Sequence, residues 1–352
     1  MYIKKIKLTN FRNYKEQEIE LTDKMNVFYG DNAQGKTNIL EAIYLCAIGK
    51  SFRTKKEKEL INFQENFSEI EVDYEKKDRS GKIKLEISDK KTFYSNGIKI
   101  KKISEILGKI NIVMFSPDDI DILKGSPNKR RKFLDIMISQ LRPSYLYNLN
   151  QYIKTMEQRN NYLRQIKYNN KDINLLDIWD EKLIDLGEKI YNYRKEFIEK
   201  IDIILNNIHK KITEEKENIK IEYISNYIEK NKFKENLIKK RQLDIEKGYT
   251  TIGIHRDDFI IYINGKPVNL YGSQGQNRTV VLSLKITELE IASEEIGEKP
   301  VLLLDDFMSE LDEKRRNSFF DNIENIQVLI TCTDKINKEN TKIFNVKDGK
   351  IV

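Results

Sequence analysis

The pattern of hydrophobic and polar positions divides the chain into a strand-rich beginning, a helical middle and a mixed end. Apolar and polar residues alternate, as in strands with one buried face, in residues 2–8, 70–74 and 83–87. Residues 93–100 and 259–270 each carry an Asn-Gly pair, which predicts two β-hairpins. From about residue 127 to residue 247 the apolar residues return at helical spacing, and we expect this stretch to be helical.

The clearest periodic stretch runs from Leu176 to Ile212, where apolar residues return mostly in steps of three and four. This spacing is typical of a coiled-coil seam or of a long bundle helix. Residues 145–166 predict a second helix that could pack antiparallel to it. The pattern leaves open whether these helices form a projecting arm or an ordinary four-helix bundle.

Two continuous apolar runs, residues 25–29 and 301–304, predict strands that are buried on both faces. The first run leads into GDNAQGKT and then into a helical pattern, so the Gly-x4-Gly-Lys-Thr motif lies between a strand and a helix. This context favours a phosphate-binding loop over a plain glycine turn with surface Lys and Thr. We expect the nucleotide-binding residues to be Gly30, Asp31, Asn32, Ala33, Gln34, Gly35, Lys36, Thr37 and Asn38.

The chemistry of this loop, residues 30–37, follows from its backbone and from two side chains. Its N–H groups would wrap the phosphates of ATP, and the N-terminus of the next helix would add positive potential. Lys36 would reach the outer phosphates as a catalytic residue, and Thr37 would bind Mg²⁺.

Two acids follow the second apolar run, and they predict the residues that hold the metal ion and activate water at the same site. Asp305 follows the end of an expected parallel strand, where α/β sheets bind their ligands, and would hold Mg²⁺. Asp306 would be the general base that activates the attacking water. An acidic turn after a strand is the alternative, and the phosphate loop upstream argues against it.

A third motif, SQGQ at residues 273–276, precedes a strongly apolar helical pattern. Ser273 is a suitable N-cap, and with Gln274 and Gly275 it forms a turn that suits an anion. The loop at residues 30–37 already serves the chain's own nucleotide. The second turn therefore predicts contact with a phosphate held by another copy, although a plain capped helix start explains the turn taken alone.

Composition narrows the function only slightly. The net charge of +7 is compatible with nucleic acid, but lysine is abundant throughout and no compact basic block stands out. Two cysteines, Cys46 and Cys332, and two histidines, His209 and His255, predict neither a disulfide framework nor a zinc site. The charged N-terminus is unlike a signal peptide, and no apolar run approaches about 18 residues, so we expect a cytoplasmic protein with no membrane partner.

The spacing of the motifs predicts the domain organisation. Because residues 38–272 separate the phosphate loop from the SQGQ turn, the ATPase must close around an insertion. We expect residues 1–124 and 246–352 to form one discontinuous α/β head with a mixed sheet. Residues 125–245 would form the inserted, mainly helical arm or lobe.

Six motifs together resemble the RecF family of bacterial recombination-repair proteins. They are GDNAQGKTN at 30–38, GKSFRT at 49–54, RRKFLD at 130–135, HRDDF at 255–259, SQGQNRT at 273–279 and VLLLDDFMSELD at 301–312. This family belongs with the SMC and Rad50-like ATPases, whose heads are of the ABC type. The resemblance therefore implies an ABC-type ATPase head with an inserted helical arm.

The same resemblance implies an ATP-dependent, DNA-binding homodimer of recombinational repair, replication restart and the SOS response. Ser273, Gln274 and Gly275 would contact the γ-phosphate of the opposite subunit, and residues 309–312 would form a D-loop across the interface. The DNA would be duplex, single-stranded, or a gap or junction. RecO and RecR would be partners in loading RecA, and the protein would be nucleoid-associated.

Two arginines gain roles from this resemblance. Arg12, in the NFRNY element, would approach the nucleotide, and Arg53 stands where similar heads carry an arginine linked to DNA sensing. A surface ion pair is the alternative for both.

Two departures from the usual ABC pattern indicate slow hydrolysis. Asp306 stands where Glu is usual and is one methylene shorter, and Thr331 or Thr333 stands where a switch histidine is expected. We expect a weak, DNA-stimulated ATPase whose ATP state persists as a DNA clamp. An ABC transporter subunit and an SMC-like tether are the alternatives; the long insertion opposes the first and the short arm opposes the second.

Overall fold

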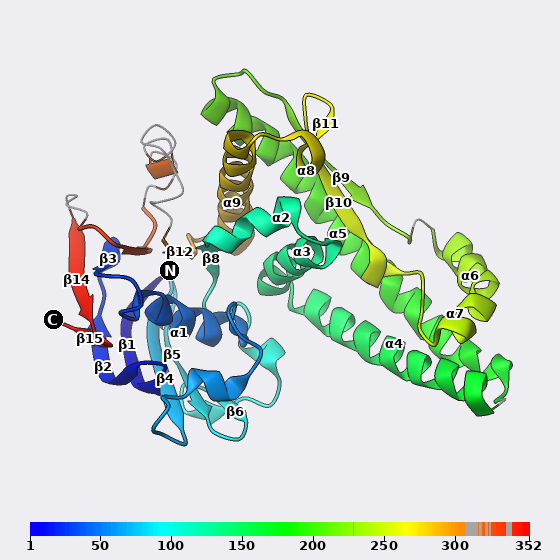
Figure 1. The fold of residues 1–352 in the computed structure, drawn as a ribbon, viewed down its shortest axis with the longest axis horizontal. Helices are drawn as coiled ribbons and strands as arrows, with labels where there is room; N and C mark the ends of the chain where they lie inside the picture. Colours follow the sequence, from blue (N-terminus) through cyan, green and yellow to red (C-terminus); the bar gives the residue numbers. More distant parts are fainter. Residues whose placement is uncertain are drawn as a thin grey trace. The chain divides into compact units, whose positions relative to one another are not determined.

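The structure, a computed structural model, describes residues 1–169, 171–227, 229–306, 316, 319–320, 323, 325–335 and 340–352. These residues form two compact units, Met1–Ile120 with Arg278–Val352, and Asp121–Asn277. The first boundary lies close to the one expected from the sequence. The second differs, because residues 246–277, which we expected in the head, belong to the second unit (Figure 1).

The first unit opens with an antiparallel sheet in the strand order β2-β1-β4-β5-β6-β7. Its strands are β1 (Tyr2–Phe11), β2 (Tyr14–Glu20), β4 (Ser68–Glu75), β5 (Ser80–Ile87), β6 (Lys91–Ser95) and β7 (Ile98–Lys99). Every second residue of β4 is buried, as the alternation predicted. Asn96 and Gly97 have φ values of 50° and 79°, which confirms the first hairpin turn.

The second sheet of this unit is mixed, in the order β15-β14-β3-β13-β12-β8. Its strands are β3 (Met25–Tyr29), β8 (Ile112–Phe115), β12 (Val301–Leu304), β13 (Val328–Cys332), β14 (Thr341–Lys347) and β15 (Lys350–Ile351). All are parallel except β15. All four residues of β12 are buried between two parallel neighbours, which confirms the predicted central strand.

Helix α1 (Lys36–Ile48) contacts strands of both sheets, namely β4 and β5 of the first and β13 of the second. The helix is apolar around most of its circumference, as expected for a helix in the core, and nearly all its residues are buried. Three short 3₁₀ turns complete the described connections of this unit: η1 (Glu57–Leu60), η2 (Ile103–Glu105) and η3 (Pro117–Ile120).

The second unit is mainly helical. Its elements are α2 (Asp121–Lys124), α3 (Pro127–Leu141), α4 (Pro143–Asn169), η4 (Ile173–Leu176), α5 (Asp177–Thr213), α6 (Lys230–Lys239), α7 (Arg241–Lys247), η5 (Ile254–Arg256) and α8 (Val268–Tyr271), with strands β9 (Ile219–Ile224), β10 (Asp258–Ile263) and β11 (Lys266–Pro267). Figure 1 shows α4 and α5 packed along each other, which confirms the two predicted long helices. Helix α9 (Gln274–Ile296) begins in this unit and continues into the first.

A small sheet in the second unit was not predicted. Strand β9 lies in the stretch that we expected to be helical, and that expectation is wrong at residues 219–224. Ile219 and Ile221 are buried, whereas Lys220 and Glu222 are exposed. The strand pairs antiparallel with β10 and contacts α5, so the second hairpin, although correctly predicted, packs in this unit.

Candidate functional site

The phosphate loop connects β3 to α1 and has a backbone that requires glycine at two positions. Gly30 and Gly35 have φ values of 148° and 111°. A Cβ atom at Gly30 would lie 2.3 Å from the carbonyl oxygen of Val346, and one at Gly35 would lie 2.6 Å from the Asn13 side chain. Ala33 also has a positive φ, of 65°. The loop is therefore fixed in a conformation that few sequences adopt.

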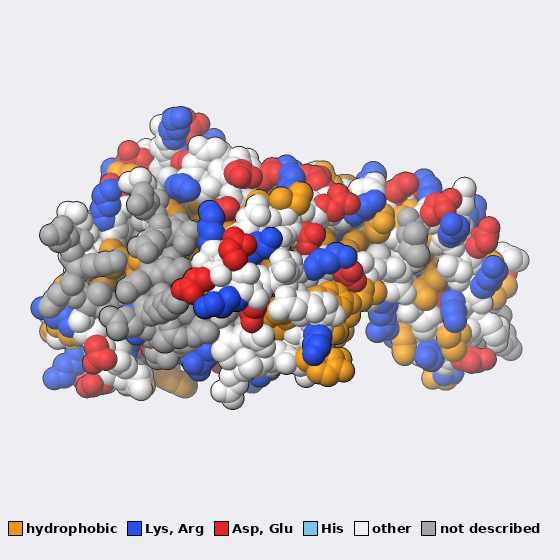
Figure 2. All heavy atoms as spheres, turned by 90° about the horizontal axis from the view of Figure 1, so that it is seen from above, with side chains coloured by type: hydrophobic (Ala, Val, Ile, Leu, Met, Phe, Trp, Pro, Cys, Tyr) orange, Lys and Arg blue, Asp and Glu red, His pale blue; other side chains and the backbone are white. Residues whose placement is uncertain are grey.

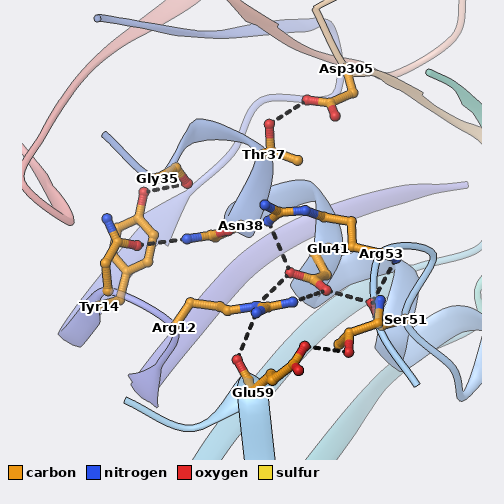
Figure 3. Close-up of polar contacts among 12 residues, drawn as sticks. Arg12, Tyr14, Gly35, Thr37, Asn38, Glu41, Ser51, Arg53, Glu59 and Asp305 are labelled. Carbon is orange, nitrogen blue, oxygen red and sulfur yellow. Dashed lines mark hydrogen bonds and ion pairs between the residues drawn. The ribbon is translucent and has the colours of Figure 1, made fainter. Parts of the chain in front are cut away.

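Two neighbouring turns hold this loop from outside. Asn13 Nδ2 and the backbone N–H of Gly349 donate to the carbonyl oxygen of Gln34, at 2.8 and 3.1 Å. The hydroxyl of Tyr14 donates to the carbonyl oxygen of Gly35 at 3.1 Å (Figure 3). Sequence reasoning missed both side chains, although they belong to the NFRNY element from which it selected Arg12.

The Lys36 side chain is folded across the loop. Its ammonium donates to the carbonyl oxygens of Gly30 at 2.6 Å and Asp31 at 2.8 Å, and the residue is only 9% exposed. The positive charge is therefore held within the curve of the loop, beside the N-terminus of α1. Both features favour an anion at this position.

Thr37, in the first turn of α1, meets Asp305, which directly follows β12. Thr37 Oγ1 donates to Asp305 Oδ1 at 2.7 Å (Figure 3). Thr331 Oγ1 donates to the same oxygen at 2.8 Å. Burial raises the pKa of Asp305, while these two hydroxyls and the charge of Arg53 act in the opposite direction. The geometry thus concentrates hard oxygen atoms, the ligands that Mg²⁺ prefers, beside the phosphate loop.

Asp306 follows with an exposed side chain and a φ of 46°, which is uncommon for a residue other than glycine. Its backbone N–H donates to Thr331 Oγ1 at 2.9 Å. Of the two threonines considered for the switch position, Thr331 is thus buried against both acids, whereas Thr333 is exposed. The hydroxyl of Thr331 fixes how the two acids leave the strand.

Both predicted arginines share one buried carboxylate, that of Glu41, which sequence reasoning missed. Arg12 donates to the two oxygens of Glu41 from Nε at 2.9 Å and Nη2 at 2.8 Å, and Arg53 Nη1 lies 3.4 Å from one of them (Figure 3). Glu41 is fully buried, whereas the Arg12 and Arg53 side chains are 17% and 43% exposed. An acid on an otherwise apolar helix, one turn after Thr37, was the available indication.

An open pocket of about 1290 Å³ lies beside these arginines. Its lining is mostly polar or charged and includes Arg12, Asn13, Asn38 and Arg53, together with Phe63. Phe63 is fully exposed, which is unusual for so large an apolar side chain.

The SQGQ turn lies at the start of α9 in the second unit. Ser273 Oγ accepts the backbone N–H of Gln276 at 3.1 Å, and Gln276 Oε1 accepts the N–H of Ser273 at 2.9 Å. This reciprocal pair is a capping box and confirms Ser273 as the N-cap. Gln276 Nε2 also donates to Glu217, two residues before β9, so this carboxylate helps to orient the turn.

Three further expectations concern the D-loop, the distribution of charge and the membrane. The predicted D-loop, residues 309–312, lies outside the described residues. Figure 2 shows Lys and Arg side chains interspersed with Asp and Glu over the described surface of one face. Within the described ranges, no helix combines the length and apolar character needed to cross a membrane.

Comparison with known proteins places this chain in a family. A family model described as the RecF/RecN/SMC N terminal domain matches residues 2–350. The DNA replication and repair protein RecF of Clostridium tetani is 46% identical over 367 residues, covering 100% of both chains. The same protein of Clostridium botulinum (strain Okra) is 46% identical over 363 residues, covering 100% of this chain and 99% of the relative.

Comparison with solved structures leads to the same family. The structure of the recombination mediator protein RecF-ATP in the RecFOR pathway has a TM-score of 0.95 and 41% identity, covering 100% of this chain and 97% of that one. An Smc head bound to the C-winged helix domain of ScpA has a TM-score of 0.59 at 17% identity, and so shares the fold. The α/β ABC-type head with a helical arm is thus confirmed. On this full-length similarity, the chain belongs to the RecF family of DNA replication and repair proteins.

Proposed function

We propose that the chain is an ATP-dependent DNA-binding protein of recombinational repair and replication restart. ATP bound at residues 30–38 would join two copies on DNA, and slow hydrolysis would release them. The observation that carries this proposal is the hydrogen bond between Thr37 and Asp305, which closes the phosphate loop with a buried carboxylate. The similarity to a RecF structure with ATP supports the choice of nucleotide.

The residues present fit ATP with Mg²⁺. Thr37 and Asp305 would hold the ion through oxygen atoms, and Lys36 would exchange its bonds to loop carbonyls for bonds to phosphate oxygens. When bound, Mg²⁺ supplies positive charge that stabilises the outer phosphates during their transfer. Burial already disfavours the ionised form of Asp305, so a cation beside it would offset that penalty.

Slow ATP hydrolysis would follow from Asp306 and Thr331, which lie next to the proposed metal ligands. Asp306 would orient the attacking water as the general base, with its backbone held by Thr331. Thr331 directs its hydroxyl to Asp305 and carries no charge, so it would not supply the cation of a switch histidine. The ATP state would therefore persist long enough to act as a clamp.

Dimerisation would use the SQGQ turn. The backbone at Ser273, Gln274 and Gly275 lies at the N-terminus of a 23-residue helix, whose dipole favours a phosphate. Because one phosphate loop serves each chain, the turn would meet the γ-phosphate bound by a second copy, twice under two-fold symmetry. Arg12 would lie near the nucleotide, and Arg53 would relay the presence of DNA.

The DNA partner would be duplex, single-stranded or gapped, contacted mainly through its phosphates. RecO and RecR would be the protein partners in loading RecA, which the RecFOR pathway of the similar structures supports. We place the protein in the cytoplasm, associated with the nucleoid. The relatives are DNA replication and repair proteins, which favours this function over a transporter subunit or a structural tether.

Fluorescence anisotropy with labelled gapped duplex tests this function. We expect the apparent Kd to be at least tenfold lower with ATP and Mg²⁺ than with ADP, and this difference to vanish in Lys36→Ala. Equal DNA affinity in both nucleotide states would refute the ATP dependence. No DNA affinity in either state would refute the DNA-binding function itself.

A further inference from the structure

The side-chain amide of Gln276 in the SQGQ turn is held at both ends, by partners of opposite chemistry. Its Oε1 accepts the backbone N–H of Ser273 at 2.9 Å, and its Nε2 donates to Glu217 Oε1 at 2.8 Å. A backbone N–H only donates and an ionised carboxylate only accepts, so the two contacts permit a single orientation of the amide. Glu217 therefore selects the orientation that closes the capping box at the start of α9.

We propose that Glu217 is a positioning residue for dimerisation: it fixes Gln276, and through Gln276 the SQGQ turn that meets the phosphate bound by a second copy. This role rests on the proposed function, in which ATP joins two copies at this turn. It adds a residue from outside the turn on which that joining depends. Glu217 acts only through Gln276 and needs no contact with the nucleotide.

Glu217 is itself held by the long helix α5. Its second oxygen, Oε2, lies 3.1 Å from Nε2 of His209, which is near the C-terminal end of α5 and is fully buried. Burial lowers the pKa of His209, so the neutral ring can donate its Nε2 proton to the carboxylate. The two oxygens of one carboxylate thus connect the end of this 37-residue helix to the SQGQ turn.

The backbone on either side of Glu217 leaves the residue little freedom to shift. The N–H of Asn218 donates to Asn264 Oδ1 at 3.0 Å, and the N–H of Asn264 donates to the carbonyl oxygen of Asn218 at 2.9 Å. On the other side, Glu214 and Glu215 have φ values of 54° and 60°. Two consecutive residues in this left-handed region persist only where their surroundings enforce it. The segment between α5 and β9 therefore presents Glu217 to the turn from a fixed position.

The turn depends on these polar contacts because packing holds it only weakly. Ser273 and Gln274 are exposed, as suits a turn that meets another molecule. Asn277 donates from Nδ2 to two carbonyl oxygens at the start of the turn, at 2.9 and 2.8 Å. Glu217 acts on the opposite polarity, since Gln276 accepts a backbone N–H. The N–H groups at a helix N-terminus are the ones that meet a phosphate, so the loss of Glu217 should weaken that contact.

Two substitutions of Glu217 separate its hydrogen bond from its charge. Glu217→Ala removes both. Glu217→Gln removes the charge but keeps an oxygen that can accept from Gln276, while the other neutral tautomer of His209 accepts from the new amide. A residue that acts by positioning Gln276 therefore predicts different effects of the two changes. A residue that acts by its charge on the bound phosphate predicts the same effect for both.

Sedimentation velocity of the full chain in ATP and Mg²⁺, over a range of protein concentrations, measures the Kd of the dimer. In Glu217→Ala we expect this Kd to rise at least about tenfold, because a hydrogen bond to a charged group is lost at each of two symmetric contacts. In Glu217→Gln we expect it to stay within about threefold of the wild type. ATP affinity of the monomer, measured at low protein concentration, should be unchanged in both variants.

A matched control and a double variant exclude a merely structural role. Glu222→Ala removes a carboxylate of β9 that is 45% exposed and paired with Lys220, and it should leave the dimer Kd unchanged. In a Gln276→Ala background, Glu217→Ala should weaken the dimer no further, because its effect passes through Gln276. A Glu217→Ala variant with a lower melting temperature but the dimer Kd of the wild type would overturn the proposal.

The remaining outcomes distinguish this role from the proposed function. If the wild type stays monomeric when saturated with ATP, the proposed function fails and the role of Glu217 fails with it. If the wild type dimerises but Glu217→Gln is as weak as Glu217→Ala, the charge of Glu217 is what matters. Only the positioning role is then overturned, and dimerisation by ATP stands.

Discussion

Thr37 and Asp305 lie 268 positions apart in the sequence, yet Thr37 Oγ1 donates to Asp305 Oδ1 at 2.7 Å. The strand order places β13 between β3 and β12, all three parallel, so the ends of β3 and β12 open at the same edge of the sheet. The phosphate loop follows one of these ends, and the two acids follow the other. The sheet thus assembles the candidate site from segments at the two ends of the chain.

Asp305→Asn should separate stability from function. Burial raises the pKa of Asp305, so ionised carboxylate is disfavoured in the folded chain, and a neutral amide would relieve that penalty while still accepting bonds from Thr37 and Thr331. We expect the nucleotide-free variant to be more stable in urea unfolding. We also expect Mg²⁺ to lose its effect on ATP affinity. A less stable variant that keeps the Mg²⁺ effect would contradict this role.

Thr331→Val should show that the threonine at the switch position is structural. The change removes the donor to Asp305 and the acceptor of the Asp306 N–H, both at the buried end of β13. We expect unfolding to become easier by about 2 kcal/mol. Thr333→Val, at the exposed position directly after β13, is the matched control and should stay within about 0.5 kcal/mol. Equal effects of the two changes would argue against this account.

His255 should make the stability of the chain depend on pH. Burial lowers the pKa of His255 to about 4, and its ring contacts the Tyr152 hydroxyl and the Thr250 carbonyl oxygen, both at 3.1 Å. The unfolded chain binds a proton near pH 6.5 and the folded chain does not until about pH 4, so stability falls as pH drops through this window. The loss is on the order of 3 kcal/mol. Urea unfolding of the wild type and of His255→Gln, measured between pH 7 and 4, should show this loss of unfolding free energy in the wild type only. If the unfolding free energies of both proteins fall in parallel with pH, His255 is not the cause.

Asp306→Asn should slow hydrolysis without preventing ATP binding. The exposed side chain of Asp306 leaves the strand beside the metal corner, and an amide cannot accept the proton of the attacking water. We expect turnover to fall at least a hundredfold and the ATP-bound dimer to live correspondingly longer in a chase with excess ADP. Unchanged turnover would remove Asp306 from the role of base.

Much of the head could be predicted because each of its elements has a recognisable pattern within a short stretch of sequence. The phosphate loop, the strand before Asp305 and the hairpin at Asn96-Gly97 are each specified within about ten residues. The parallel arrangement that joins the loop to the acids follows from a general rule on where α/β sheets bind ligands. The local pattern was therefore sufficient for the predicted core of the site.

The partners of buried charges could not be predicted, because they come from distant segments. Glu41 is an isolated acid in an apolar helix until Arg12 and Arg53 are brought to it. In the second unit, Arg194 of α5 is buried against Asp135 and Asp257, although the apolar period of that helix gave no reason to place an arginine inside. Similarly, β9 escaped prediction because its partner β10 follows after two intervening helices.

Two motifs of the family resemblance also gain a physical meaning only in three dimensions. Arg130 of the RRKFLD motif forms a bidentate pair with Asp258 of the HRDDF motif, with bonds of 2.5 and 2.9 Å. The pair joins α3 to the start of β10 within the second unit. These motifs therefore stabilise that unit and need no direct role at the nucleotide.

The central claim is that ATP joins two copies through the SQGQ turn, and sedimentation velocity of the full chain tests it most directly. With Mg²⁺, we expect a dimer in ATP and a monomer in ADP. Ser273→Arg replaces a capping side chain with a long one at a turn that must approach a phosphate closely, so this variant should bind ATP as the wild type does and remain a monomer. A wild-type chain that stays monomeric when saturated with ATP, or a variant that dimerises like the wild type, would contradict the account.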